Sequence, residues 1–202
     1  MATTPPGWPR QHGPVEPADR DARTRDLAPA WMTSTVLWWD RDGRASVVAG
    51  PGAGPLPGGD AAVLHVLTAQ DPWGEPQTEA RNLELLGDLL VWATGTLSVP
   101  WWPATGSELD RSHHEQGIAV AGLGRAEAAA AGARFDQLAI YEVTDELLRV
   151  VSCPDARVEA EGARRWAGPD GDPARPAVPD HVAARWWSVY GEVASTRDLS
   201  SI

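Results

Sequence analysis

The chain of 202 residues contains no lysine and only one cysteine. The single cysteine, Cys153, excludes an intrachain disulfide framework and any zinc site built from several cysteines. No apolar run approaches the ~20 residues of a membrane-spanning helix, and the N-terminus lacks the apolar segment of a signal peptide. These absences predict a cytoplasmic protein that has no membrane partner.

Positive charge is scarce as well. Seventeen arginines stand against 28 acidic residues, which gives a net charge of −11 and an isoelectric point near 4.8. Such a chain repels polyanions, so nucleic acid is not an expected partner. Lysine, asparagine, phenylalanine, tyrosine and isoleucine are all rare, and their codons are AT-rich, which indicates a GC-rich source. Asn82 and Phe135 are the only residues of their type.

The stretch 63–82 holds the clearest local pattern. Residues 63–67 (VLHVL) have the length and branching of a strand, and residues 68–74 (TAQDPWG) form a polar turn after it. Thr78 stands where a helix N-cap belongs, and Glu79 follows in the first turn. A polar loop between a strand and a helix N-terminus is a common place for a small polar ligand.

The remaining chain divides into an arm and one domain. Residues 1–28 are rich in proline and charge, and we expect a disordered or extended arm there. Residues 29–202 are expected to form a single domain, with a core at 60–153 and an extension at 154–202. Leucines at helical spacing predict a helix over 79–93, and the pattern at 181–193 predicts a C-terminal helix.

The order of elements in the core predicts the fold class. A strand, a helix, two strands, a second helix and a final hairpin follow one another, with an earlier strand or hairpin at 33–49. The second helix, 125–134, is rich in alanine, and we expect Ala126, Ala129, Ala130 and Ala133 to let it lie close to the sheet. The prediction is an α+β two-layer sandwich with a mostly antiparallel sheet, two packed helices and the C-terminal helix.

Several short motifs occur in a familiar order. They are Thr68-Ala69, Asp71-Pro72, Asn82 before a leucine-rich helix, Gly106, Glu115 before a strand, and Phe135-Asp136-Gln137-Leu138-Ala139. Over about residues 60–153 the chain resembles a bacterial family, domain of unknown function 3293. That family has T-A-x-N-P-x-S, an Asn opening a helix, a Glu before a strand, and F-G-Q-x-A. Here Asp71 replaces the Asn of Asn-Pro, which exchanges an amide for an acceptor-only carboxylate. The resemblance implies no established activity.

The polar residues at strand and helix ends predict a site. Asp71 and Glu115 are the candidate catalytic bases, and the candidate ligand contacts are Thr68, Trp73, Asn82, His114 and Gln137. In one interpretation these side chains line a pocket that binds or acts on a small polar molecule. In the other they form a buried hydrogen-bond network that holds the loop. The pattern does not decide whether the chain is an enzyme.

Other chemistries are less well supported by the sequence. Neighbouring residues such as His113 and His114 point to opposite sides of a strand, and the H-E-x-x-H spacing is absent, so we predict no metal site and no cofactor. Cys153 follows an apolar strand, as buried core cysteines do. No G-x-S-x-G motif is present.

Tryptophan is abundant, with 11 residues and pairs at 38–39, 101–102 and 186–187. In a strand each pair would place one ring inward and one outward. Outward rings, together with a sheet edge, would form a surface for a homodimer or a protein partner. A non-catalytic interaction protein is therefore the alternative function.

Overall fold

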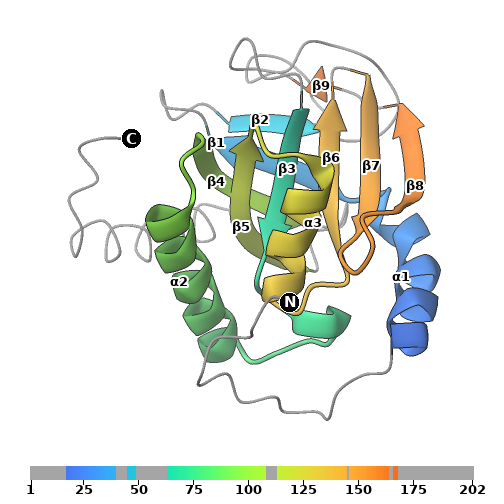
Figure 1. The fold of residues 1–202 in the computed structure, drawn as a ribbon, viewed down its shortest axis with the longest axis horizontal. Helices are drawn as coiled ribbons and strands as arrows, with labels where there is room; N and C mark the ends of the chain where they lie inside the picture. Colours follow the sequence, from blue (N-terminus) through green and yellow to red (C-terminus); the bar gives the residue numbers. More distant parts are fainter. Residues whose placement is uncertain are drawn as a thin grey trace.

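The computed structural model describes residues 17–39, 45–48, 63–107, 113–144, 146–163 and 166–167. These residues form three α-helices, one short 3-10 helix and a single sheet (Figure 1). The helices are α1 (Pro17–Trp31), α2 (Glu79–Thr96) and α3 (Arg125–Arg134), and the 3-10 helix is η1 (Pro72–Gly74). The strands are β1 (Thr35–Trp39), β2 (Ala45–Val48), β3 (Val63–Thr68), β4 (Trp101–Ser107), β5 (His114–Ala121), β6 (Ala139–Thr144), β7 (Leu147–Ser152), β8 (Val158–Ala163) and β9 (Trp166–Ala167).

The sheet has the order β8-β7-β6-β3-β5-β4-β1-β2-β9, and each of its pairings is antiparallel. The predicted α+β class and the antiparallel sheet are therefore confirmed. β3 is an interior strand, since it pairs with β5 on one side and β6 on the other. The end of β3 consequently lies in the middle of the sheet, where side chains from both neighbours reach it.

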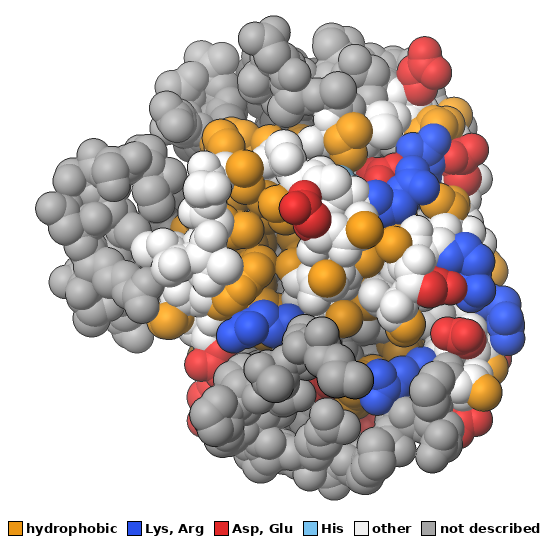
Figure 2. Space-filling model, in the orientation of Figure 1, with side chains coloured by type: hydrophobic (Ala, Val, Ile, Leu, Met, Phe, Trp, Pro, Cys, Tyr) orange, Lys and Arg blue, Asp and Glu red, His pale blue; other side chains and the backbone are white. Residues whose placement is uncertain are grey.

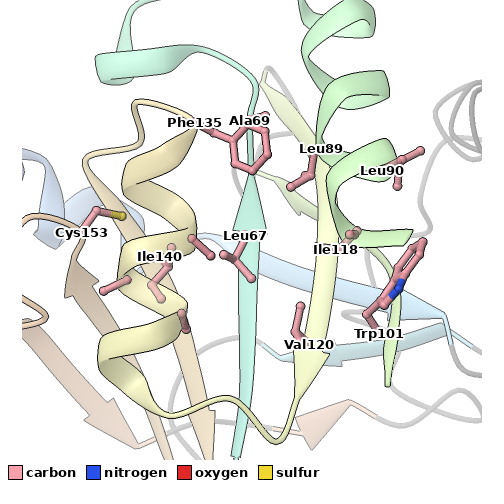
Figure 3. Packing of buried hydrophobic residues seen from close by; sticks show 14 of the residues in the cluster. Leu67, Ala69, Leu89, Leu90, Trp101, Ile118, Val120, Phe135, Ile140 and Cys153 are labelled. Carbon is pink, nitrogen blue, oxygen red and sulfur yellow. The ribbon is translucent and has the colours of Figure 1, made fainter. Parts of the chain in front are cut away.

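Helices α2 and α3 cover one face of the sheet (Figure 1). Between them and the strands lies the larger apolar core, which includes Leu67, Leu89, Ile118, Phe135 and Cys153 (Figure 3). On this face apolar side chains are visible between the two helices (Figure 2). Burial raises the pKa of the Cys153 thiol, so this residue is the small core group that the sequence predicts.

The chemistry of the two helices explains how they pack. The side chain of Thr78 accepts a hydrogen bond from the Arg81 N–H, which confirms the predicted N-cap of α2. α3 approaches β6 so closely that a Cβ on Gly132 would lie 2.7 Å from the side chain of Ile140.

The predicted contact face of α3 is wrong. The buried residues are Ala128, Ala129, Ala131 and Gly132, whereas Ala126, Ala130 and Ala133 are exposed.

The other face of the sheet is covered by two of its own strands, β1 and β2, and by α1. β1 and β2 pass behind β3 and β5 (Figure 1), and Val36 of β1 shares a second buried cluster with Leu64, Val66 and Leu148. α1 lies against β7 and β8. The sheet is therefore curled, and its concave face encloses space beneath α1.

The expected disordered arm over 1–28 is wrong for residues 17–28, which belong to α1. Charge and proline hid this helix because its stability comes from tertiary contacts rather than from an apolar stripe. Thr24 and Ala28 are fully buried, Arg23 pairs with Glu75 at 3.1 Å, and the Arg20 guanidinium lies 4.0 Å from the centre of the Trp73 ring. Residues 1–16 and the predicted helix at 181–193 lie outside the described residues.

The tryptophan pair 101–102 differs from the expectation of one ring inside and one outside. Trp101 is buried in the larger core, and Trp102 packs partly buried against the cluster on the concave face. Both rings are covered because both faces of the sheet are covered. Among tryptophans whose side chains the structure describes, none is exposed; the side chains of the pairs 38–39 and 186–187 are not among them. No described helix has the length and apolarity needed to cross a membrane.

Candidate functional site

The loop after β3 is held by side chains rather than by regular structure. Thr68 donates its hydroxyl hydrogen bond to the Gln116 carbonyl oxygen at 2.9 Å and accepts one from the Gln70 N–H at 3.0 Å. The buried Gln70 side chain accepts a hydrogen bond from the Gln116 N–H at 2.6 Å and donates to the Asn82 carbonyl oxygen at 3.2 Å. Gln70 therefore links β3 to β5 and α2, and it fixes where the loop leaves the sheet.

Asp71 lies at the bend of this loop, and its backbone is left-handed, with φ 46° and ψ 53°. Aspartate is one of the few non-glycine residues that tolerate this region. Asn82, in the first turn of α2, binds Asp71 twice: its Nδ2 donates to Oδ1 at 2.9 Å, and its Oδ1 accepts from the Asp71 N–H at 3.0 Å. The Gln77 N–H also donates to Oδ1, at 2.7 Å. One carboxylate oxygen is thus fully engaged in holding the loop.

The other oxygen of Asp71 faces two residues at the start of β5. Nε2 of His113 lies 3.2 Å from Asp71 Oδ2 and also 3.2 Å from Glu115 Oε1. The exposed fractions of the side chains are 5% for Asp71, 43% for His113 and 28% for Glu115. We call these three residues the Asp71 triad. It joins a buried, fixed carboxylate to an imidazole and a second carboxylate that solvent reaches.

The Asp71 triad lies in the wall of a cavity of about 400 Å³ on the concave face of the sheet. Side chains from β3, β6 and α1 form the rest of the wall. The apolar part includes Leu27, Val66, Leu138 and Val150, and the polar part includes Ser34, Thr68, Gln137 and Tyr141. The cavity is therefore apolar over much of its surface and acidic at one end.

Electrostatics at the acidic end are unbalanced. Desolvation raises the pKa of Glu115, and the negative charge of Asp71 raises it further, whereas the hydrogen bond and charge of His113 lower it. Among the described residues, His113 is the one side chain paired with the two carboxylates that can carry a positive charge. The acidic end consequently carries excess negative charge facing open space.

Two polar side chains near the start of β6, Gln137 and Tyr141, complete the cavity. Gln137 is buried and donates from Nε2 to the Gln70 carbonyl oxygen at 2.9 Å. Its amide oxygen has no hydrogen-bond partner among the described residues, although the side chain lines the cavity. Tyr141 donates its hydroxyl hydrogen bond to the Trp31 carbonyl oxygen at 3.0 Å, which ties the end of α1 across the cavity.

The structure brings four of the predicted residues to the cavity wall: Thr68, Asp71, Glu115 and Gln137. Asn82 is not in that wall but lies behind Asp71, which it orients. Trp73 and His114 are also absent from the wall. Trp73 instead packs against Arg20.

Of the adjacent pair of histidines, the structure places His113 in the cavity wall, whereas the sequence pattern singled out His114. Side chains alternate along an extended segment, so His113, directly before β5, shares a face with Glu115 while His114 takes the other. Because Glu115 was already a candidate, this alternation would have been enough to identify His113 as its neighbour. Trp31, Ser34 and Tyr141 were missed as well, and their positions depend on how α1 and β6 meet at the cavity.

Comparison with known proteins finds one match. No curated protein and no solved structure matches the chain. Residues 67–140 match the model of a family described as a protein of unknown function (DUF3293). The matched segment contains the whole Asp71 triad together with Asn82 and Gln137. The predicted resemblance is confirmed: residues 67–140 of this chain resemble the DUF3293 family.

Proposed function

We propose that this chain binds a small molecule in the cavity on the concave face of its sheet. The observation that carries the proposal is the convergence of Asp71, His113 and Glu115 at one end of a cavity of about 400 Å³. Small-molecule sites are typically concave, ~300–1,000 Å³ in volume, and mostly apolar with a few polar groups that fix orientation. The ligand that suits this cavity has an apolar body and one polar end.

The contacts assign a role to each part of the wall. Val66, Leu138 and Val150 contact the apolar body, and the Gln137 amide oxygen accepts a hydrogen bond from the ligand or from a bridging water. The polar end of the ligand lies against the Asp71 triad. Because two carboxylates face one imidazole there, the occupied site includes a cationic group that balances them.

If the bound molecule reacts, Glu115 is the residue best suited to act as a general base. Asp71 has one oxygen committed to Asn82 and Gln77. Glu115 is reached by solvent, and its raised pKa makes it a stronger base than an ordinary carboxylate.

A cavity-filling variant tests the proposal. Gly106 lines the cavity, and a Cβ built there meets no atom within 4 Å. Gly106→Leu should therefore place its side chain in the cavity without disturbing the sheet. Gly87 of α2 also has nothing within 4 Å of a Cβ and is not in the cavity wall, so Gly87→Leu is the matched control.

The probe is a library of fragments with apolar bodies and single polar groups, measured by thermal shift and ligand-observed NMR. We expect fragments that bind the wild type and Gly87→Leu equally but lose at least tenfold in affinity for Gly106→Leu. The proposal fails if no fragment binds, or if the binding fragments do not distinguish Gly106→Leu from the control.

A further inference from the structure

We propose that the Asp71 triad binds a divalent transition-metal ion at the acidic end of the cavity. The inference deepens the proposed function and rests on it, since the ion would be the cationic group to which the small molecule is bound. Its ligands are Oδ2 of Asp71, Nε2 of His113 and a carboxylate oxygen of Glu115. These three atoms all lie within 4.8 Å of one another.

The spacing of these atoms matches the ligand separations around a metal ion as well as those of a hydrogen bond. First-row ions bind nitrogen and oxygen ligands at ~2.0–2.2 Å, and ligand angles near 90–110° then separate neighbouring ligand atoms by roughly 3.0–3.4 Å. The two distances from His113 Nε2 are both 3.2 Å. The side chain of Glu115 is partly exposed, so a small rotation can bring its oxygen into place beside Asp71.

Hydrogen bonding alone leaves this arrangement unsatisfied. A single ring nitrogen of His113 faces both carboxylates, and one N–H donates a well-aligned hydrogen bond to only one acceptor at a time. A divalent ion at the centre replaces the shared N–H with three direct bonds and neutralises both carboxylates. It also removes their mutual repulsion.

Side chains around the triad already orient its ligands. Asn82 and the Gln77 N–H both bind Oδ1 of Asp71, which leaves Oδ2 directed towards His113. Hydrogen-bonded partners of this kind hold metal ligands in position. Independently, the buried Gln137 lines the same cavity with an amide oxygen that has no partner among the described residues. That oxygen can accept a hydrogen bond from a water or ligand group bound to the ion.

The ligand set selects the kind of ion. One imidazole with two carboxylates suits Zn²⁺, Mn²⁺ or Fe²⁺, whereas Mg²⁺ and Ca²⁺ prefer sets made only of oxygen. Three protein ligands beside a cavity leave coordination positions open for water or an exogenous ligand, as catalytic rather than structural zinc sites do. An organic ammonium group is the competing cation. It would bind through the charge of the two carboxylates and would not need the His113 nitrogen as a ligand.

The test is calorimetric titration of the full chain, stripped with chelator, with ZnCl₂, MnCl₂ and MgCl₂. We expect one Zn²⁺ per chain with a micromolar or tighter dissociation constant, weaker Mn²⁺ binding, and no measurable Mg²⁺ binding. His113→Ala should weaken Zn²⁺ binding at least a hundredfold. The matched control is His114→Ala, which removes the neighbouring histidine outside the cavity wall and should change Zn²⁺ affinity less than threefold.

Asp71→Asn provides a second variant that should remain folded. The amide oxygen can still accept the hydrogen bonds from Asn82 and Gln77, while the anionic ligand is lost. With Co²⁺ as the probe, the wild type should show the visible absorption bands of a site with four or five ligands, and Asp71→Asn should not. Equal Zn²⁺ binding by the wild type and His113→Ala would overturn the proposal, whatever the fold of the other variants.

The outcomes separate this inference from the proposed function. Zn²⁺ binding that depends on His113, without any fragment sensitive to Gly106→Leu, supports the metal site and rejects the small-molecule cavity. Fragments that depend on Gly106, without stoichiometric Zn²⁺ binding, support the cavity and reject the metal site. Hexylammonium serves as the probe for an organic cation. If the protein binds hexylammonium at the Asp71 triad but takes up no Zn²⁺, the metal ion is rejected as the cationic group.

Discussion

Glu142 and Glu115 each lie beside a histidine in the same sheet, yet the two carboxylates differ in how many positively charged partners they have. On the helix-covered face, Glu142 accepts hydrogen bonds from Arg125 at 2.7 and 2.8 Å and from Arg149 at 2.7 Å, and it lies 3.2 Å from Nε2 of His65. Arg149 also pairs with Glu161. We call these five residues the Glu142 cluster. Blue and red side chains lie together over β7 and β8 on this face (Figure 2).

The charges of the Glu142 cluster are balanced, whereas those of the Asp71 triad are not. Two arginines face two glutamates, and burial lowers the pKa of His65, which is therefore neutral at pH 7. The Arg125 guanidinium lowers the pKa of Glu142 to about 2, with help from Arg149 and His65. The pKa of Glu115 instead moves upwards. A buried carboxylate with full partners holds the fold together, and one that lacks them beside a cavity is a candidate for binding a ligand.

The largest expected effect is a loss of folding stability when the Glu142 cluster is disrupted. Glu142→Gln leaves two partly exposed arginines facing a neutral amide, so the expected loss is ~3 kcal/mol, the low end of the cost of breaking a buried ion pair. Chemical denaturation at pH 7 should show this loss, while Zn²⁺ affinity stays within threefold of the wild type. A loss below about 1 kcal/mol would show that the Glu142 cluster does not stabilise the fold.

The second expected effect is a dependence of that loss on pH. Glu142 titrates at its ordinary value of 4.5 in the unfolded chain and at about 2 in the fold. A lowered folded-state pKa gives stability that is present above pH 4.5 and is lost as the pH falls towards 2, amounting to roughly 3 kcal/mol. The difference in unfolding free energy between the wild type and Glu142→Gln should therefore shrink over this window. A difference that stays constant between about pH 5 and pH 2 would contradict the assignment.

The third effect concerns Asn82, which supports the Asp71 triad from outside the cavity. Asn82→Ala leaves the Asp71 N–H without its acceptor and should destabilise the chain by ~1–3 kcal/mol. It should also weaken Zn²⁺ binding ~10–100-fold, because Asp71 is no longer oriented. Thr78→Ala removes the cap of the same helix and serves as the control, with a cost of ~1 kcal/mol and unchanged Zn²⁺ affinity. Equal Zn²⁺ affinity in both variants would show that Asn82 acts on the fold alone.

The smallest effect has the opposite sign. Glu115→Gln removes one of two neighbouring like charges, so the chelator-treated protein should gain ~0.5–1 kcal/mol of stability while it loses Zn²⁺ binding. Thermal unfolding with and without ZnCl₂ measures both changes. A destabilised Glu115→Gln protein would mean that the pair with His113 contributes to the fold, as Glu142 does, and the contrast between the clusters would disappear.

Local patterns predicted the elements of the core well. The run at 63–67, the cap at Thr78 and the leucines of α2 depend on neighbours within a few residues, and the structure has β3 at Val63–Thr68 and α2 at Glu79–Thr96. α1 escaped prediction because distant partners, such as Glu75 and Tyr141, hold it in place. The expectation of an outward ring was wrong for the pair 101–102 for a related reason, since the pattern of a strand does not reveal whether both faces of a sheet are covered.

By itself, the sequence determined the order of elements in the core, the antiparallel class and the chemical types at the site, because spacing and side-chain chemistry act locally. The tertiary structure alone decided which of these groups meet. It placed His113 rather than His114 beside Glu115, turned Asn82 towards the back of Asp71, and gave Glu142 two arginines while leaving Glu115 with one imidazole. The energy of a charge depends on the groups and solvent around it in space, and the chain reveals those neighbours only once it is folded.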